Sequence, residues 1–440
     1  MRFMKFKLAA LLAMILPLIL VLTGGTSLAK TKPAVTTQSS GPLVLWVDAP
    51  RVSAVKAFEK AYPNIKVKMN IINDNIGNDA LEGKFQLFNE AGSGWPDAIF
   101  TVTNSDISWM TSTKIHYAAN LTNLVPKKIL NGYAPAANAA CHIDGKVMCL
   151  RNDDAADVLW YNAKLFKEWG YKVPKTWPQY EALGLKIAKQ HPGYYVGLIG
   201  DDYTFDRYFW GSGCPANSLV GPNTVKIDLQ SPNCTRMVNL LDTLLKAKVL
   251  STAGLFSTAS NAVGKKLVMT PGATWYGEFE FNGPWKVPAG EISASSPLVW
   301  PGFPYTGDEG GGMWVMSSHI SGTLRQDALK FIEFVATNPK NQVNLVPTFP
   351  AYGPDEQGWL QKNVVDSHYF VDPQQIVKAF KQAVKMVWTG HPYTEFDPDG
   401  IWDTTVVPAL EQGKNLKQVW PTYQRELVDY AQLYGYSVKQ

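Results

Sequence analysis

Apolar and polar residues follow two different periodicities near the start of the folded part of the chain. A run of β-forming residues at 43–47 predicts a buried strand. Apolar residues spaced three or four apart predict a helix over 52–62, which ends at Pro63. Alternation at 65–69 predicts a second strand. A strand, a helix and a strand in succession are typical of a βαβ unit, and this unit indicates a parallel sheet covered by helices.

Strands and helices continue to alternate after this unit. Thr176 is expected to cap a helix, because its side chain can accept a hydrogen bond from the first turn and Pro178 suits that turn. The chain from 373 onward is expected to be mostly helical. The other expected strands are residues 98–100, 158–161 and 313–316, and the other expected helices are residues 79–90, 163–169 and 324–337.

The first 29 residues have the pattern of an export signal. Basic residues precede an apolar stretch at 8–22, and the small residues Ser27 and Ala29, on either side of Leu28, suit a cleavage site. A membrane helix is the alternative, but the apolar stretch is short for a bilayer. We expect residues 1–29 to be a cleaved signal peptide. Residues 30–41 are rich in Thr, Ser, Lys and Pro and are expected to form a flexible tether.

Size and composition indicate a two-lobed globular protein that binds a ligand through aromatic rings. A chain of 440 residues exceeds the usual size of one domain. Its 46% hydrophobic and 18% charged residues are typical of a folded protein. Basic and acidic residues are nearly balanced, with a net charge of +4, which argues against a protein that binds nucleic acid. The 15 Trp are more than a core needs, which favours rings presented to a ligand.

The four cysteines agree with export. Cys141 and Cys149 flank an Asp-Gly pair, which is a hairpin turn signal, so the two thiols should face each other. Cys214 and Cys234 flank a loop rich in Gly, Pro and Asn. Four cysteines allow three connectivities, and the spacing favours the two local disulfides. A zinc site is the alternative, although the spacings match no CxxC pattern.

Six segments, in this order, resemble the sugar-binding family of extracellular solute-binding proteins of ABC importers, which includes maltose-binding protein. The resemblance covers nearly all of the mature chain. The relatives from Gram-positive bacteria often carry a lipobox Cys at the cleavage site, where this chain has Thr23-Gly24-Gly25-Thr26. The segments are Leu45-Trp46 with 57–67, then 95–99, then 144–146 with 160–166, then 174–177, then 310–314 and 328–334.

The resemblance implies an α/β, two-lobed periplasmic-binding-protein-like fold, in which each lobe is a mixed sheet flanked by helices and the ligand cleft lies between the lobes. Lobe 1 is expected to comprise 42–153 and about 292–346, and lobe 2 to comprise 154–291 and about 347–440. The implied function is a receptor in the periplasm or on the outer face of the membrane. It would capture a sugar by cleft closure and deliver it to the permease subunits of an ABC importer. We expect a monomer with no catalytic activity, no metal and no cofactor.

The resemblance also implies the ligand contacts. Sugars carry hydroxyl groups around apolar ring faces, so their sites need aromatic rings and strong hydrogen-bonding groups. The matching positions lie near expected strand ends. They are Asp48, Asp106, Trp109, Asp154, Tyr203, Trp210, Trp275, Trp314 and Trp402.

Each of these positions also has a structural interpretation. Asp48 can cap the helix over 52–62, and Asp154 can belong to a solvated loop. The ring-rich segment 203–210 can be a core helix, and Trp314, although it follows three glycines, can be a core residue.

Two tryptophans are expected to be ligand contacts because of their positions next to particular segments. Trp275 follows the apolar segment 269–272, where the family often has a ring that stacks on sugar. Trp402 is expected to precede a helix over 404–410 and to match the family's last ring position.

Three other functions stay open. A polyamine receptor would use similar acids and rings. Tyr194-Tyr195 could suggest an iron receptor, although no His or Asp cluster supports the pair. A secreted glycosidase would need two carboxyl groups a few ångströms apart, and the chain has no GxSxG, HExxH or P-loop motif. The segment 397–400 is only weakly similar to a calcium loop, because it lacks the later ligands.

Overall fold

The computed structural model describes residues 41–72, 78–136, 138–390 and 393–440. The expected signal peptide and all of the expected tether except Gly41 lie outside these ranges. Within them, none of the helices combines the length and the apolar character that a membrane span requires.

The first sheet contains the βαβ unit predicted from the sequence. Strands β1 and β2 are parallel and are joined through helix α1 (Val52–Ala61), and β3 is parallel to β1 on its other side. Strand β14 runs antiparallel to both β3 and β6, so the sheet is mixed. In spatial order the strands are β2 (Val67–Ile71), β1 (Leu43–Val47), β3 (Ala98–Thr101), β14 (Met313–Met316) and β6 (Leu150–Arg151).

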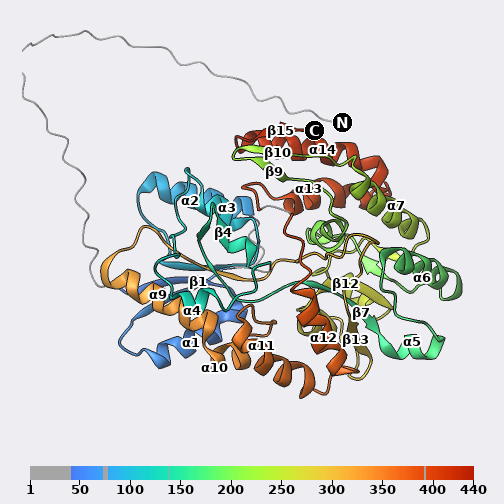
Figure 1. Cartoon of the computed structure of the whole chain (residues 1–440), viewed down its shortest axis with the longest axis horizontal. Helices are drawn as coiled ribbons and strands as arrows, with labels where there is room; N and C mark the ends of the chain where they lie inside the picture. Colours follow the sequence, from blue (N-terminus) through green and yellow to red (C-terminus); the bar gives the residue numbers. More distant parts are fainter. Residues whose placement is uncertain (1–40, 73–77, 137, 391–392) are drawn as a thin grey trace, which may run out of the picture. The chain divides into compact units, whose positions relative to one another are not determined.

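Helices cover both faces of this sheet because its strands β1, β3 and β14 are mostly apolar on both sides (Figure 1). Leu45 belongs to a core cluster with residues of α1 and α9 (Gly322–Thr337), whereas its neighbour Trp46 belongs to a cluster with residues of α2 (Asn78–Ala91) and α3 (Asp106–Thr111). Successive side chains of a strand point to opposite faces, which gives this alternation. Burial on both faces also explains why the run 43–47 is continuously apolar.

The second sheet is antiparallel. Its central strand, β7 (Asp157–Asn162), pairs with β12 (Met269–Ala273) on one side and with β13 (Ile292–Ser295) on the other. Helix α5 (Ala163–Trp169) follows β7 directly and is capped by Asn162, whose side chain accepts a hydrogen bond from Leu165 N. Helix α12 (Pro373–Ala383) contacts both β7 and β13.

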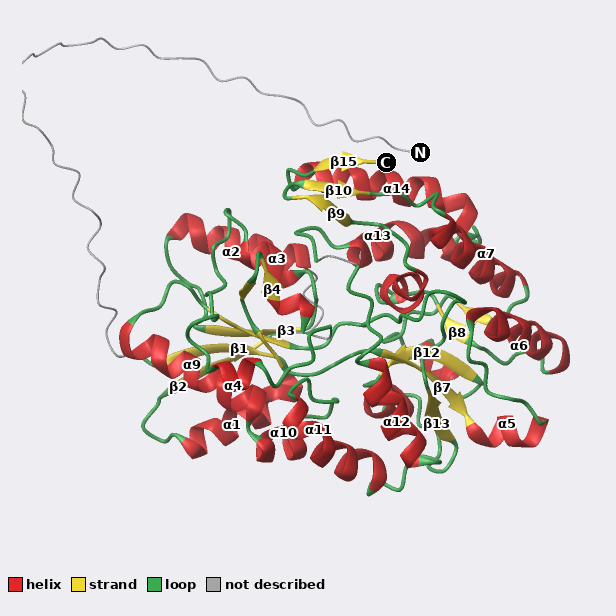
Figure 2. Ribbon diagram, viewed as in Figure 1, coloured by secondary structure: helices red, strands yellow, loops and turns green. Residues whose placement is uncertain are grey.

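Three smaller sheets and further helices complete the described residues (Figure 2). The small sheets are β15 (Ser437–Lys439) with β10 (Thr224–Lys226) and β9 (Ser218–Gly221), then β8 (Gly197–Leu198) with β11 (Leu250–Ser251), then β4 (His142–Ile143) with β5 (Lys146–Val147). The helices are α4 (Lys127–Leu130), α6 (Trp177–Gln190), α7 (Pro232–Lys246), α8 (Ser260–Gly264), α10 (Pro339–Leu345), α11 (Gly353–Leu360), α13 (Pro398–Glu411) and α14 (Leu416–Leu433). Short 3-10 segments are η1 (Ala49–Arg51), η2 (Ala139–Cys141) and η4 (Trp210–Ser212), and π-helical segments are η3 (Phe205–Phe209), η5 (Gly277–Phe281) and η6 (Gln361–Val365).

The boundaries of several elements differ from the sequence predictions, most of all that of α13. The second strand covers 67–71 instead of 65–69. Helix α13 begins at Pro398 instead of 404, because the Asp397 side chain accepts a hydrogen bond from Asp399 N and Pro398 occupies the first turn. Trp402 therefore lies inside this helix and does not precede it. Thr176 caps α6 as expected.

The cysteines form the two local pairs that their spacing favoured. Cys141–Cys149 closes the hairpin of β4 and β5, and Cys214–Cys234 joins the chain after η4 to the first turn of α7. None of the four is left with a free thiol.

Two buried arginines hold the chain just before β14. The Arg151 side chain has no exposed surface and donates to Asp308 Oδ2 at 2.7 Å and to the Gly310 carbonyl at 2.5 Å. The Arg207 side chain, on η3, is equally buried and donates to both carboxylate oxygens of Glu309 at 3.1 and 2.9 Å. We call Asp308–Gly312 the clamped segment, since guanidinium groups from β6 and from η3 hold neighbouring residues of it.

Replacing Arg151 with Met should lower the free energy of unfolding by about 3–5 kcal/mol, because the substitution leaves the Asp308 carboxylate buried without its partner. Chemical denaturation followed by circular dichroism measures this change. Lys164→Met is the matched control, since Lys164 pairs with Glu291 at 2.7 Å but its own side chain is 62% exposed. We expect the control to leave the unfolding midpoint nearly unchanged. Equal effects of the two substitutions would contradict the role given to Arg151.

Candidate functional site

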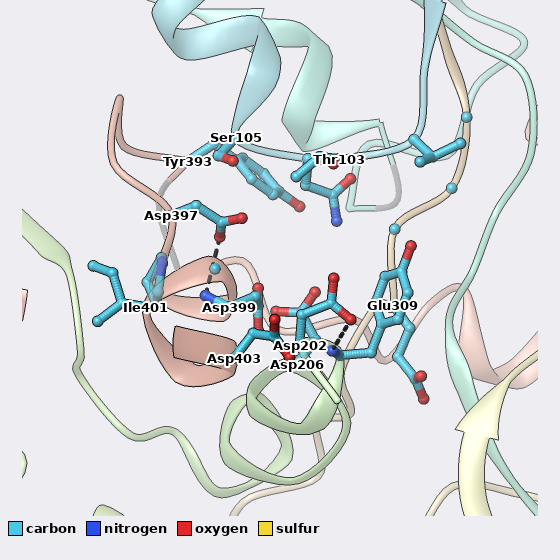
Figure 3. Close-up of a pocket in the computed structure, with 18 of the residues that line it drawn as sticks. Thr103, Ser105, Asp202, Asp206, Glu309, Tyr393, Asp397, Asp399, Ile401 and Asp403 are labelled. Carbon is cyan, nitrogen blue, oxygen red and sulfur yellow. Dashed lines mark hydrogen bonds between the residues drawn. The ribbon is translucent and has the colours of Figure 1, made fainter. Parts of the chain in front are cut away.

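A pocket of about 710 Å³ lies beside the clamped segment. Loops that follow strands line it, among them the loop after β1, the loop after β3 and the residue two positions after β12. The segment before η3 and the first turns of α13 contribute most of another wall (Figure 3). The pocket is thus built from distant parts of the sequence, which the two main sheets bring together.

Three aromatic rings form a face of the pocket. The Phe256 and Trp275 rings are stacked, with centroids 5.8 Å apart and planes at 18°. The Tyr203 ring meets the Trp275 ring edge-on at 5.9 Å. Phe256 is 59% exposed, whereas Trp275 is 8% exposed, so Phe256 offers most of its ring to a ligand. Rings arranged in this way can pack against an apolar molecular face.

The clamped segment orients these rings. The Trp275 indole donates to the Glu309 carbonyl at 3.1 Å, and the hydroxyl of Tyr276 donates to Glu309 Oε2 at 2.8 Å. Arg207, which already binds that carboxylate, also donates to Asp201 at 3.0 Å. Glu309 therefore holds Trp275 through its backbone carbonyl and the neighbouring Tyr276 through its side chain.

Glycines let the clamped segment run close to its neighbours at the pocket wall. Gly311 has a φ of 86°, and a Cβ there would lie 2.3 Å from Arg151 Nη2. A larger residue would therefore have to displace the buried guanidinium. The Gly312 N–H donates to Asp153 Oδ1 at 3.1 Å.

One cation lines the pocket among the described residues, and it is paired. Arg51 bonds Asp48 at 2.9 Å and Asp153 at 3.4 Å, and its guanidinium lies 4.1 Å from the centre of the Phe100 ring. Asp48 Oδ1 also accepts from the Arg51 backbone N–H at 3.1 Å. Asp48 thus caps the turn before α1 and also faces the pocket.

Four carboxyl groups gather on the wall formed by the η3 region and the start of α13, and we call them the acidic wall: Asp202, Asp206, Asp399 and Asp403 (Figure 3). Asp206 is 3% exposed and is hydrogen-bonded to Asp399. Two carboxyl groups in direct contact favour a shared proton. Burial raises the pKa of Asp206 well above its ordinary value, and burial followed by the neighbouring Asp206 charge does the same to the pKa of Asp399.

Four of the nine expected ligand contacts line this pocket: Asp48, Tyr203, Trp210 and Trp275. The other five residues do not line it. Among them, Asp106 accepts hydrogen bonds from Thr101 and from the Trp109 indole, the latter at 2.9 Å. Both residues are buried, and Trp109 packs against Phe85 of α2.

The remaining three lie within the protein interior. The Trp314 side chain is in β14, donates to Asn152 at 3.0 Å and meets the Phe331 ring edge-on. The Trp402 ring packs among Phe209, Trp420 and Tyr423. Asp154 is 1% exposed, and burial raises the pKa of its carboxyl group well above its ordinary value.

The sequence predictions did not include several residues that the structure places in the pocket. The segment 397–400 was noticed only for its weak similarity to a calcium loop. The described residues contain no group of three or more acidic, His or Cys side chains placed to hold a metal ion. The spacing of the acidic residues in α13 was a further signal for this part of the pocket. Asp403 comes one turn after Asp399, so the two lie on one face of the helix. The pocket residues in question are Arg51, Asp202, Asp206, Phe256, Glu309, Asp399 and Asp403.

Comparison with known structures establishes the class of fold. The chain is similar to the ABC transporter associated binding protein from B. animalis subsp. lactis Bl-04, solved in complex with beta-1,6-galactobiose, at 22% identity and a TM-score of 0.74, covering 91% of this chain and 99% of that one. It is also similar to the galacto-N-biose-/lacto-N-biose I-binding protein from Bifidobacterium longum, solved with lacto-N-biose, at 18% identity, the same TM-score and the same coverage. The fold is the two-lobed periplasmic-binding-protein fold, as the resemblance implied.

The family follows from the sequence itself. Residues 47–342 match the model of the bacterial extracellular solute-binding proteins, and the chain belongs to this family. The chain is also 24% identical over 313 residues to the multiple sugar-binding protein of Streptococcus mutans, covering 66% of this chain and 69% of that one. The family consists of solute-binding receptors and is not a family of enzymes.

Neutralising Asp206 should stabilise the protein at high pH. A carboxyl group whose pKa is raised on folding holds its proton in the folded state after the unfolded chain has lost it. Stability is therefore lost as the pH rises from the ordinary pKa, near 4, through the raised value. We expect Asp206→Asn to have a higher melting temperature than the natural protein at pH 8 and a shrinking advantage towards pH 4. Asp366→Asn, at an exposed position, is the control. An advantage of Asp206→Asn that did not change with pH would contradict this reasoning.

Proposed function

We propose that this protein is an exported receptor that captures a sugar or oligosaccharide in the pocket beside the clamped segment and delivers it to an ABC importer. The observation that carries the proposal is the pairing of a stacked aromatic face with a wall of hydrogen-bond acceptors in one 710 Å³ pocket. Sugars have this combination of apolar ring faces and hydroxyl donors. Closure of the two lobes would remove the bound sugar from water.

The relatives support this ligand class. The similar protein from Streptococcus mutans is named for binding multiple sugars, and the two similar solved structures contain disaccharides. Family membership supports permease subunits of an importer as the partner. We also propose that residues 1–29 are removed on export, that 30–41 form a tether, and that the receptor acts as a monomer without nucleic acid.

The lobes of the proposed receptor would meet at the pocket. Lobe 1 would comprise 42–153 and about 292–346, and lobe 2 would comprise 154–291 and about 347–440. The two main sheets support these bounds in part, since β1, β3 and β14 fall in the first set and β7 and β12 in the second. Strand β13 pairs with β7, so the second lobe should extend through β13 instead of ending at 291.

Binding without hydrolysis is part of the proposal. Retaining glycosidases hold two carboxyl groups about 5 Å apart, with the glycosidic bond between them. Asp206 and Asp399 are hydrogen-bonded to each other, which leaves no space for that bond. The buried acids are therefore better suited to accept hydrogen bonds from a ligand than to cleave it.

Replacing Trp275 with Ala should weaken sugar binding roughly ten- to hundredfold, because the ligand loses an aromatic surface worth about 1–3 kcal/mol. Calorimetric titration measures the affinity, and a melting curve measures the stability. Trp402→Phe is the matched control, since Trp402 is fully buried away from the pocket. We expect it to lower the melting temperature with little change in affinity. Unchanged affinity in Trp275→Ala would remove Trp275 from the site.

Prolonged incubation with the oligosaccharide that binds best should yield no hydrolysis product by chromatography. The reason is that no pair of carboxyl groups is proposed to act on the glycosidic bond. Asp399→Asn provides the control, since it removes one member of the buried pair. Product that accumulates with the natural protein and disappears with Asp399→Asn would identify a glycoside hydrolase instead.

A further inference from the structure

The pocket carries far more negative than positive groups. Nine carboxyl groups line it, against Arg51 as the one cation among the described residues. Neutral sugars need hydrogen-bond acceptors, but they do not need this excess of charge. The distribution of the countercharges shows where the excess lies.

Two parts of the pocket have a cationic partner. Arg51 forms ion pairs with Asp48 and Asp153, and Arg207 binds Glu309 from behind the pocket. The acidic wall differs, because none of Asp202, Asp206, Asp399 and Asp403 forms an ion pair with a described Lys, Arg or His. Four carboxyl groups on one wall therefore have no cationic partner among the described residues.

A buried acceptor on this wall has an unused bonding position. Asp206 is 3% exposed and lines the pocket, and its hydrogen-bond partner among the described residues is the Asp399 carboxyl group. Apart from the proton that this pair shares, the Oδ1 atoms of both residues are buried without an N–H or hydroxyl donor from a described residue. Buried carboxylate oxygens without a donor are costly, so they indicate that a donor arrives with the ligand. Figure 3 shows both residues beside Asp202 and Asp403, facing the space between this wall and Thr103.

The aromatic face lies next to the acidic wall, because Tyr203 directly follows Asp202 in the chain and its ring contacts Trp275. A ligand that touches both must have an apolar face and, beside it, a positively charged donor. An acyclic polyamine has the charge but offers little flat apolar surface, whereas an amino sugar has both.

We infer that the preferred ligand is a sugar that carries a protonated amine, which the acidic wall binds while the sugar ring packs against Phe256 and Trp275. This inference rests on the proposed sugar receptor and names its substrate class. The ammonium group supplies donors to the Asp206 and Asp399 carboxyl groups and the countercharge that the wall lacks.

Binding of the amine should release protons. Burial holds the Asp206 and Asp399 pair partly protonated, and a bound cation favours the ionised carboxylates, so the carboxyl proton passes to the buffer. Other carboxyl groups also raise the pKa values of this pair through their negative charge. They are Asp397 and Asp202 on the pocket side and Asp157 and Asp308 behind it.

The first experiment uses sets of matched ligands on the purified natural protein. Each set has a neutral sugar, its amino sugar and its N-acetylated form, in gluco and galacto configurations and as monosaccharides and disaccharides, with spermidine added separately. We expect the amino sugar to bind at least about tenfold more tightly than its neutral and acetylated partners. Calorimetry in buffers of different ionisation enthalpy should show proton release for the amino sugar alone.

The second experiment uses variants. Asp206→Asn and Asp399→Asn should each weaken binding of the amino sugar about tenfold more than binding of the neutral sugar, so that the amino sugar preference is lost. Asp366→Asn removes the same charge at an exposed position outside the pocket and should leave the preference unchanged. A melting curve confirms that each variant is folded, and the ligand comparison on the natural protein needs no variant.

The outcomes separate this inference from the proposed function. Equal binding of the neutral and amino sugars, or tighter binding of the neutral sugar, overturns the inference and leaves the sugar receptor standing. Binding of spermidine with no binding of any sugar overturns both, in favour of a polyamine receptor. Binding of none of the ligands also overturns both.

Discussion

The arrangement of the site depends on two arginines that are withdrawn from solvent and bind adjacent acids. Arg151 comes from the first sheet and Arg207 from η3, and they hold Asp308 and Glu309. A charge buried in this way is stable only while its partner is present, so neither guanidinium can leave without disrupting the segment between them. The same segment orients Trp275 through a backbone carbonyl. The aromatic face is consequently positioned by an electrostatic contact behind it and not by packing alone.

Much of the fold could be predicted because local signals agreed with the final structure. The unit β1–α1–β2, the cap at Thr176 and the hairpin closed by Cys141 and Cys149 all follow from residues within one short stretch. The direction of β14 could not be predicted in this way. An apolar run buried on both faces has the same pattern whether its strand is parallel or antiparallel. The early start of α13 was not predicted, although Asp397 and Pro398 form a cap and first-turn pair of the same kind as Thr176 and Pro178.

The site was less predictable than the fold. Trp275 was correctly placed just after β12 and lines the pocket, whereas Trp314 and Trp402 have the same residue type but lie in the interior. Ring type and strand position do not distinguish a ring that faces a ligand from one that faces a neighbouring helix. Asp206 and Asp399 are 193 positions apart in the chain, and only the three-dimensional arrangement brings them into contact. No local sequence pattern could predict a contact between residues so far apart.

The two walls of the pocket differ in how freely they can change during evolution. The clamped segment uses its side chains, its carbonyls and even the missing Cβ of Gly311 for contacts inside the protein. A substitution there disturbs the core before it alters the ligand. Asp202 and Asp403 are exposed side chains at the pocket wall, and their replacement removes no buried partner. Divergence of specificity in this lineage, or its redesign in the laboratory, would therefore proceed through the acidic wall, with the clamped segment inherited intact.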